Sequence, residues 1–349
     1  MFTGGKMKLL YWLDEWLTLS DDEKQAKLPT SGGDLLGDVY VKYHFVDLTK
    51  PLLFTFSPAG TDIQERDLNE DFAPWGYHLA QKQDVNIIAF QHLGKSNWFR
   101  NRNLIFFIEQ LSTLLSPFKT KLGYGLSRGG FAVGAFAKLL KLDKVLLFHP
   151  VSTKNKLIAP WDDRSSTEIA QQYDWQGDYH DLDLGDAKGY IIYDPTNRID
   201  RQHAKRYKQL THLRVFGMGH GTHATYLNKF GFYKQVAVDF IRDQQIDIAQ
   251  FRLQTKTLRL KEDYYKKLNK ANAKSEHRQA LLSTAHTILI DEKAAHVKEH
   301  QAKIDIQPLI EVAIKHQDES PNDAIKLLEV AQQLVPDDPL VEHKLRQLE

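Results

Sequence analysis

Hydrophobic and polar residues form short, regular runs over the first two thirds of the chain, and these runs predict the strands of a sheet. Residues 38–45 alternate, with Val39, Val41, Tyr43 and Phe45 on one face and polar or mixed residues on the other. This period of two is typical of a half-buried antiparallel strand. Further short runs, most of them nearly all apolar, are typical of buried strands: 51–56, 85–90, 121–124, 144–150, 188–195 and 213–217.

Segments with helical spacing separate several of these runs, for example the one that carries Leu104, Phe107 and Leu111. Strands that alternate with helices predict an α/β protein with a mostly parallel, twisted sheet and helices on both faces. Ligands bind beyond the carboxyl ends of the strands in such sheets. We therefore expect the functional residues at the strand ends.

Three regions follow from these patterns: an N-terminal helical segment at 1–36, a sheet domain at 37–245 and an all-helical region at 246–349. Residues 151–187 interrupt the sheet domain with a stretch that is longer than an ordinary connection and rich in Asp, Gln, Trp and Tyr. A cap over the site is one interpretation of this insertion. A solvated surface loop is the other, since its second half is acidic.

The C-terminal region is charged and poor in glycine, which favours helices. Residues 324–339 look like the end of a tetratricopeptide repeat and the turn into its successor. The resemblance covers one repeat at most, whereas about three are needed for a stable array. A plain helical appendage and a module for docking a protein partner or for self-association both remain open.

Composition narrows the function classes. The chain has 46 basic and 45 acidic residues and a net charge of +1, so no overall field favours nucleic acid or an anionic membrane as partner. A small-molecule or glycan substrate is compatible with this balance. The sequence has no cysteine, which excludes disulfides and cysteine nucleophiles. The apolar run near the start is broken by Asp14 and Glu15 and is too short to span a bilayer, so we expect a cytoplasmic protein.

The segment 123–130, Gly-Tyr-Gly-Leu-Ser-Arg-Gly-Gly, follows a predicted strand and opens into a predicted helix. Its core fits G-x-S-x-G, in which a serine lies at a strained strand-to-helix turn and small neighbours let both segments approach. Ser127 would expose its hydroxyl at the carboxyl edge of the sheet. The first turn of the helix also offers backbone N–H groups that can bind an oxyanion.

A nucleophilic serine needs a base and an acid, and in sheets with this elbow they follow it in the order carboxylate, then histidine. His220 lies in a Gly-His-Gly turn after the last strand, with His223 as the rival base. Asp194 closes the preceding strand and is the first choice for the acid, although a turn-forming Asp-Pro is its alternative reading. Asp200 is the second choice, since it could instead cap the helix that begins at Arg201.

With these residues the segment 37–243 resembles the α/β-hydrolase fold. The resemblance implies a serine nucleophile at Ser127, a general base at His220 and a carboxylate that orients the imidazole. It also implies a second oxyanion donor in the loop after the early buried strand. Our predicted donor pair is the backbone N–H groups of Ala59 and Arg128, with Gly60 as the alternative to Ala59.

The loop after the strand at 85–90 mixes aromatic and amide groups. Asn97 and Trp98 are candidate substrate contacts, and the alternative is that Trp98 and Phe99 pack the next helix onto the sheet. The histidines also suggest metal pairs such as His220 with His223 or His203 with Asp200. No recognised ligand pattern occurs, so we expect no metal.

These features predict acyl-transfer chemistry with a Ser-His-Asp triad. An esterase that uses water as acceptor is the first expectation and requires no cofactor. An O-acetyltransferase that modifies a bacterial polysaccharide or glycan, with acetyl-CoA as donor, is the second, by analogy of fold alone. The third is a non-catalytic scaffold that binds a partner through its helical C-terminal region.

Overall fold

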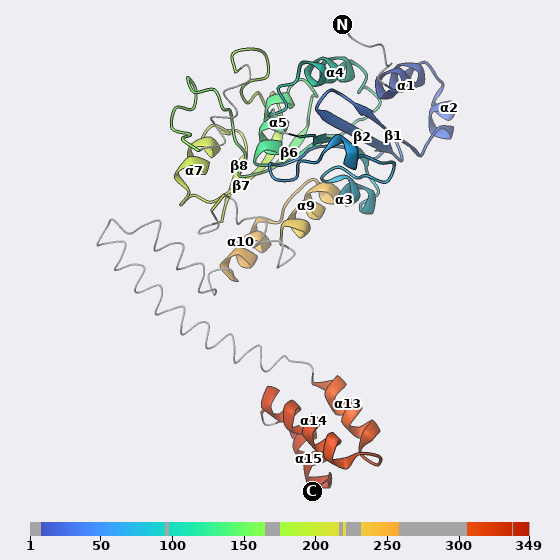
Figure 1. Cartoon of the computed structure of the whole chain (residues 1–349), viewed down its shortest axis with the longest axis vertical. Helices are drawn as coiled ribbons and strands as arrows, with labels where there is room; N and C mark the ends of the chain where they lie inside the picture. The colour runs from blue at the N-terminus through green and yellow to red at the C-terminus, as the bar shows by residue number, and fades with distance from the viewer. Residues whose placement is uncertain are drawn as a thin grey trace, which may run out of the picture. The chain divides into compact units, whose positions relative to one another are not determined.

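The computed structural model describes residues 8–94, 98–164, 175–215, 219–220, 232–257, 306–336 and 338–348. The chain divides into two compact units, Met1–Lys256 and Thr257–Glu349. The first unit holds a sheet with helices, and the described part of the second unit is helical (Figure 1). The sequence analysis places this boundary after residue 245, whereas the structure has it after Lys256. The difference arises because α10 (Ile248–Thr257) groups almost entirely with the first unit.

The first unit is built on an eight-stranded sheet with the order β1-β2-β4-β3-β5-β6-β7-β8. Strand β2 pairs antiparallel with β1 and β4, and all other neighbours are parallel. The strands are β1 (Thr30–Leu35), β2 (Val39–Phe45), β3 (Leu52–Phe56), β4 (Asn86–His92), β5 (Lys121–Leu126), β6 (Lys144–Phe148), β7 (Lys188–Tyr193) and β8 (Thr211–Arg214).

The burial of the strands follows the hydrophobic pattern. In β2 the alternate residues from Val39 to Phe45 are buried and those between are half-buried. In β3 and β4 every residue is buried, as expected for parallel strands that helices cover on both faces. The mostly parallel sheet of the α/β-hydrolase fold, predicted from the sequence, is confirmed.

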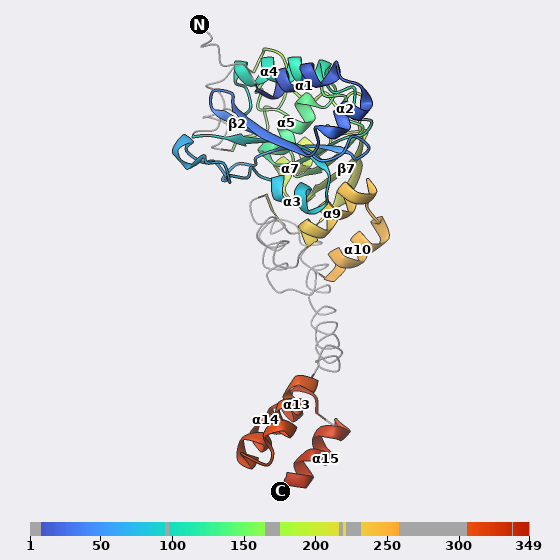
Figure 2. The same cartoon turned by 90° about the vertical axis from the view of Figure 1, so that its right-hand side faces the viewer.

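Helices lie on both faces of the sheet. Figures 1 and 2 show α1, α4 and α5 over one face and α3 and α9 over the other. The helices of this unit are α1 (Lys8–Leu17), α2 (Asp21–Ala26), α3 (Tyr77–Lys82), α4 (Arg102–Thr113), α5 (Arg128–Phe136), α7 (Arg198–Ala204), α9 (Phe232–Asp243) and α10, with a short 3₁₀ turn η1 (Glu65–Asp67).

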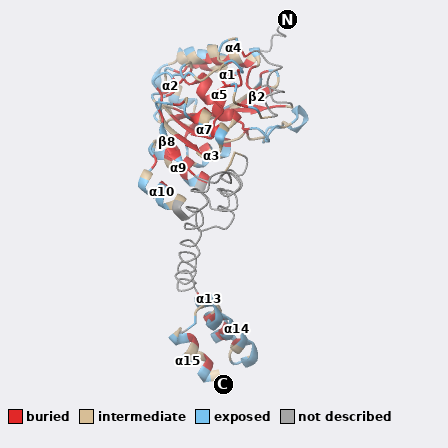
Figure 3. Ribbon diagram, turned by 90° about the vertical axis from the view of Figure 1, so that its left-hand side faces the viewer, coloured by how far each residue is buried: buried red, intermediate tan, exposed pale blue. Residues whose placement is uncertain are grey.

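The core on the α1, α4 and α5 side is rich in aromatic rings. Phe56 and Phe90 stack with ring centroids 4.5 Å apart, and Phe107, Phe136 and Trp16 are fully buried around them. Figure 3 shows the buried residues concentrated along the sheet. Burying one such side chain stabilises the fold by about 1.5–3 kcal/mol. This core therefore fixes α5 against β3, whose carboxyl end lies next to the candidate site.

The N-terminal segment is helical only in part. Helix α1 buries Leu9, Leu13 and Trp16 in the main core, so the segment is integral to the first unit. The expectation of helix over 1–36 is wrong for Thr30–Leu35, which forms β1 at the edge of the sheet. The strand contains two glycines, and a Cβ on either would collide with the ring of Tyr43 or Tyr40 on β2. This close approach explains a strand whose sequence shows no apolar alternation.

The described part of the second unit contains α13 (Gln307–His316), α14 (Pro321–Leu334) and α15 (Pro339–Leu348). They share a small apolar core that includes Ile310, Leu328 and Val341. The helical character predicted for the C-terminal region is confirmed for these residues. The resemblance to a tetratricopeptide repeat stays a prediction.

Candidate active site

Ser127 lies at the turn between β5 and α5, with φ 52° and ψ −110°. This left-handed region is strained for a residue with a side chain, and such strain concentrates at functional sites. Two glycines make the turn sterically possible. A Cβ on Gly125 would strike the backbone of Gly129, and a Cβ on Gly129 would strike the carbonyl oxygen of Phe56. The structure thus has the strand–turn–helix arrangement that the motif requires.

The Ser127 hydroxyl meets the imidazole of His220, with Oγ 2.8 Å from Nε2. On the other side of the ring, Nδ1 lies 2.7 Å from Oδ1 of Asp200. Because a carboxylate only accepts, Nδ1 carries the proton and Nε2 is free to accept the serine proton. The His220 side chain is 27% exposed and that of Asp200 is 1% exposed. The three side chains therefore form a continuous series of hydrogen-bond contacts, in which the imidazole is partly open to solvent.

Asp200, not Asp194, contacts the imidazole, which corrects the first choice made from the sequence. Asp194 Oδ1 accepts from the backbone N–H and the hydroxyl of Thr196, at 2.8 and 2.6 Å. Its Oδ2 accepts from Gly219 N–H at 2.7 Å. Asp194 thus forms the turn that its alternative reading predicted and also holds the residue before His220.

Helix α7 places Asp200 in its first turn. Asn197 is the N-cap, and its side-chain oxygen accepts from the N–H groups of Ile199 and Asp200, both at 3.1 Å. The alternative reading of Asp200, as the cap of a helix that begins at Arg201, is therefore wrong, since α7 begins at Arg198. Since asparagine is among the preferred capping residues, the Asn197 position was a signal in the sequence that left Asp200 available.

The predicted oxyanion donors lie on two segments that the structure brings together. Arg128 follows Ser127 directly, and Ala59 is in the exposed turn after β3. The fully buried side chain of Arg128 reaches that turn, where Nη2 donates to the carbonyl of Pro58 at 2.9 Å and pairs with Asp62. The collision of a Cβ at Gly129 with Phe56 independently places the end of β3 against the start of α5. The donor roles of Ala59 and Arg128 stay predictions.

Trp98 is 5% exposed and packs in an aromatic cluster. Its ring meets Phe131 of α5 and Trp175 of the insertion edge to face, with centroids 6.1 and 6.2 Å away. The ammonium of Lys154 lies 5.1 Å from the ring centroid. These contacts favour the packing interpretation of Trp98, although it joins α5 to the insertion rather than the next helix to the sheet. Asn97 lies outside the described residues.

The insertion reaches the Ser127–His220–Asp200 set through Arg164, a residue that the sequence analysis did not single out. Its Nη1 lies 3.6 Å from Oδ1 of Asp200 and 3.4 Å from Nδ1 of His220. The same guanidinium donates to both carboxylate oxygens of Asp162, at 2.8 and 2.7 Å. The insertion therefore contacts the candidate site at Arg164. This contact agrees with the interpretation of the insertion as a cap over the site.

Asp162 is the centre of a buried charge network. It accepts from Lys154 at 2.8 Å and contacts Nε2 of His203 at 3.0 Å, in addition to Arg164. Burial opposes its ionisation, but the hydrogen bonds from Arg164 and His203 and the positive charges of Arg164 and Lys154 together outweigh burial and hold the pKa of Asp162 well below its usual range. Burial lowers the pKa of Lys154 to about 8. The network stabilises the described start of the insertion beside α7.

A second serine takes part in this network. The ring nitrogen Nδ1 of His203 accepts from the backbone N–H of Ser152 at 3.1 Å and lies 2.9 Å from its hydroxyl. Burial lowers the pKa of His203, which is consistent with a neutral ring that accepts at Nδ1 and donates to Asp162. All three side chains are buried. Ser152, His203 and Asp162 are therefore the residue types of a triad, but the serine hydroxyl is buried and a substrate cannot reach it in this structure.

His223, the rival base, lies outside the described residues. Among the residues that the structure describes, no group of three or more histidine or carboxylate side chains is arranged to hold a metal ion. Within the same residues, no helix is both long and apolar enough to cross a bilayer.

The chain matches no protein-family model and no curated protein. Solved structures similar to it include an esterase from the archaeon Pyrobaculum calidifontis, with 11% identity over 68% of this chain and 91% of the esterase, at a TM-score of 0.42. The capsule O-acetyltransferase of Neisseria meningitidis serogroup A has 11% identity over 60% of this chain and 99% of its own, at 0.40. FphF, a fluorophosphonate-binding serine hydrolase of Staphylococcus aureus, has 13% identity over 61% and 97%, at 0.38. At these identities and scores the likenesses assign no activity, so function has to be argued from the side-chain geometry.

Proposed function

We propose that this protein is a serine-nucleophile acyl-transfer enzyme whose triad is Ser127, His220 and Asp200. The observation that carries the proposal is the 2.8 Å contact of a serine at a strained elbow with a histidine that a buried carboxylate orients. The residue types, their chain order and the assignment of the two ring nitrogens all agree with triad chemistry.

In this mechanism His220 takes the Ser127 proton as the hydroxyl attacks the carbonyl carbon of an ester. The tetrahedral oxyanion accepts hydrogen bonds from the N–H groups of Arg128 and Ala59. His220 then donates its proton to the leaving oxygen, and the acyl group stays on Ser127. Throughout, Asp200 stabilises the imidazolium and keeps Nδ1 protonated.

The acceptor decides between two forms of this activity. Water, activated by His220, gives an esterase, which we favour because water requires no dedicated binding site. A sugar hydroxyl gives an O-acetyltransferase with acetyl-CoA as the acyl donor, and such an enzyme has to exclude water from the acyl-enzyme. The insertion, connected to the site through Arg164, is the element we propose for that exclusion.

Covalent labelling by a fluorophosphonate probe tests the chemistry, and the chain itself offers a matched control. Ser127→Ala should abolish labelling, whereas Ser152→Ala should retain it, since Ser152 is fully buried. Thermal unfolding of both variants checks that the fold is kept. Labelling that survives in Ser127→Ala and disappears in Ser152→Ala would transfer the nucleophile to the second serine.

If neither variant nor the parent protein is labelled, the scaffold alternative replaces the catalytic one.

A second experiment distinguishes the two acceptors if the parent protein is labelled. The parent is incubated with p-nitrophenyl acetate and, separately, with acetyl-CoA and oligosaccharides. Free acetate without an acetylated sugar supports the esterase. An acetylated sugar, detected by mass spectrometry, supports the transferase.

A further inference from the structure

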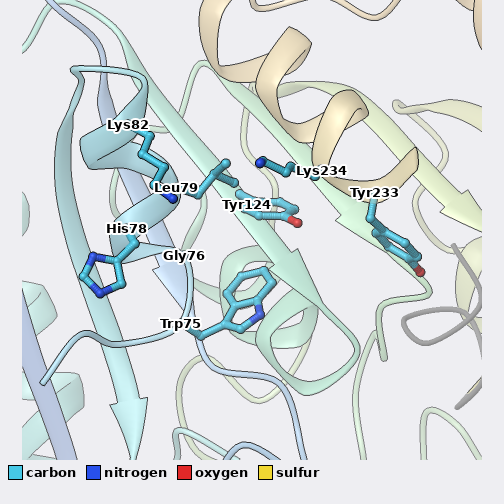
Figure 4. A pocket seen from close by; sticks show the side chains of 8 residues that line it. All are labelled: Trp75, Gly76, His78, Leu79, Lys82, Tyr124, Tyr233 and Lys234. Carbon is cyan, nitrogen blue, oxygen red and sulfur yellow. The ribbon is translucent and has the colours of Figure 1, made fainter. Parts of the chain in front are cut away.

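A separate cavity opens between α3 and α9, on the face of the sheet opposite to α1, α4 and α5. It has a volume of about 270 Å³ and is lined by Trp75, Gly76, His78, Leu79, Lys82, Tyr124, Tyr233 and Lys234. Ser127, His220 and Asp200 are not among the lining residues. Figure 4 shows that the lining side chains come from β5, from the two helices and from the segment that leads into α3. The cavity is therefore distinct from the acyl-transfer site.

Aromatic rings form the inner part of this cavity. The rings of Trp75 and Tyr124 lie 4.7 Å apart with planes inclined by 35°. Tyr233 packs on Phe148 of β6, which places its ring at the far side of the same space (Figure 4). Gly76 has φ 87°, and a Cβ there would press on the side chain of Thr55, so the turn beside Trp75 has little freedom. Flat, rigid surfaces of this kind suit a flat ring.

Two hydrogen-bond donors are available in this cavity. The backbone N–H of Trp75 binds Gln91, but its indole N–H and the Tyr124 hydroxyl form no hydrogen bond within the described part of the chain. Neither atom is among the buried atoms without a partner, so both are open to solvent. They can therefore donate to a ligand that accepts hydrogen bonds beside the aromatic rings.

Two lysines complete the lining. In Figure 4 the side chains of Lys82, on α3, and Lys234, on α9, lie at the same end of the cavity with Leu79 between them, whereas His78 points to the outer side of α3. Neither lysine forms an ion pair within the described residues, and no aspartate or glutamate lines the cavity. Among the residues that the structure describes, the charge at this end is thus uncompensated, which favours an anion.

We propose that this cavity binds a small planar anion, a single aromatic or heteroaromatic ring that carries a phosphate or carboxylate group. The ring lies against Trp75 and Tyr124, and the anionic group meets the ammonium groups of Lys82 and Lys234. A volume of about 270 Å³ is just below the usual range for ligand sites, which fits one ring rather than a dinucleotide. The proposal stands independently of the acyl-transfer chemistry.

Phenyl phosphate is the probe, with phenol and inorganic phosphate as the matched halves of the molecule. Isothermal titration should show saturable binding of phenyl phosphate and much weaker binding of either half. Replacing both lysines, as K82A/K234A, should weaken binding of phenyl phosphate roughly tenfold or more, since two charge-assisted contacts are lost. Tyr124→Phe, which keeps the ring, should weaken it roughly threefold to tenfold by removing one donor.

The control is the double variant K119A/K208A, which removes the same charge from two exposed lysines outside the cavity. It should bind phenyl phosphate as the parent protein does. Equal weakening in both double variants would reduce the effect to net charge and overturn the proposal, as would absence of saturable binding to the parent. Ser127→Ala should also bind unchanged. Loss of binding in that variant would move the probe to the acyl-transfer site.

Discussion

Two sets of serine, histidine and aspartate side chains lie in the first unit, and they differ in how the histidine is turned. In the set Ser127, His220 and Asp200, the serine meets Nε2 and the carboxylate meets Nδ1. In the set Ser152, His203 and Asp162, the serine meets Nδ1 and the carboxylate meets Nε2.

The surroundings of the two sets differ as much as the ring orientation. Ser127 is half-buried at a strained turn, and His220 is partly open to solvent. Ser152 is fully buried, its backbone N–H already occupies Nδ1 of His203, and Arg206 donates to its hydroxyl at 2.9 Å. The comparison teaches that residue types alone do not define a triad. Backbone strain, access and the partner of each ring nitrogen decide between catalysis and structure.

Replacing each histidine by alanine should give the largest contrast between the two sets. We expect His220→Ala to lower kcat/KM for an ester substrate by roughly 10³–10⁶-fold with little change in unfolding temperature, because the base is removed from a partly exposed position. His203→Ala removes a buried partner of Asp162, so it should act mainly on stability, by about 1–3 kcal/mol. Steady-state kinetics and thermal unfolding of both variants measure this. A larger loss of activity in His203→Ala would reverse the assignment.

The two aspartates near His220 offer the next contrast. Asp200→Asn should lower kcat roughly 10³–10⁴-fold, because an amide cannot stabilise the imidazolium and can favour the wrong tautomer. Asp194→Asn changes a turn and one contact to Gly219, and we expect a loss of roughly tenfold or less. The kinetics of the two variants on one substrate give the ranking directly. The opposite ranking would return the acid to Asp194.

The buried network can be tested through its pH dependence. Asp162→Asn leaves Lys154 buried with a weakened partner and should destabilise the protein at pH 7 by about 3–5 kcal/mol. Because the pKa of Asp162 is lowered in the folded state, its contribution is full above the ordinary carboxyl pKa of 3.8 and is lost as the pH falls through the lowered value. The stability gap between parent and variant should therefore narrow below about pH 4.

Chemical denaturation at several pH values measures that gap. The control is Asp183→Asn, which breaks the exposed pair of Asp183 with Lys138 and should change stability little at any pH. A gap for Asp162→Asn that stays constant down to strongly acidic pH would show that the carboxylate charge does not stabilise the network.

The strand-to-helix turn at Ser127 and most strands of the sheet could be predicted from local patterns in the sequence. The G-x-S-x-G pattern and the buried runs depend on neighbouring residues, so they could be found without a structure. Strand β1 could not, since its glycines are explained only by the rings of Tyr40 and Tyr43 on the next strand. Strand β8 was expected at 213–217. The structure has it at Thr211–Arg214, where it pairs with β7, and residues 216–217 of the prediction lie outside the described part of the chain.

The choice between Asp194 and Asp200 shows where reasoning from sequence ends. Both residues follow β7, and distance from the strand favoured Asp194. In the structure Asn197 takes the cap of α7, and one helical turn directs Asp200 to His220. Arg164 was not predictable either, because its contacts join residues far apart in the sequence.

The buried guanidinium of Arg128 has a consequence for the predicted oxyanion hole. One predicted donor is the N–H of Arg128 itself, and the other predicted donor, the N–H of Ala59, is on the turn that the Arg128 side chain holds through Pro58 and Asp62. A single residue therefore connects the two segments that carry the predicted donors. We expect a substitution at Asp62 to change the distance between these segments and so to alter which acyl groups fit at the reacting carbon.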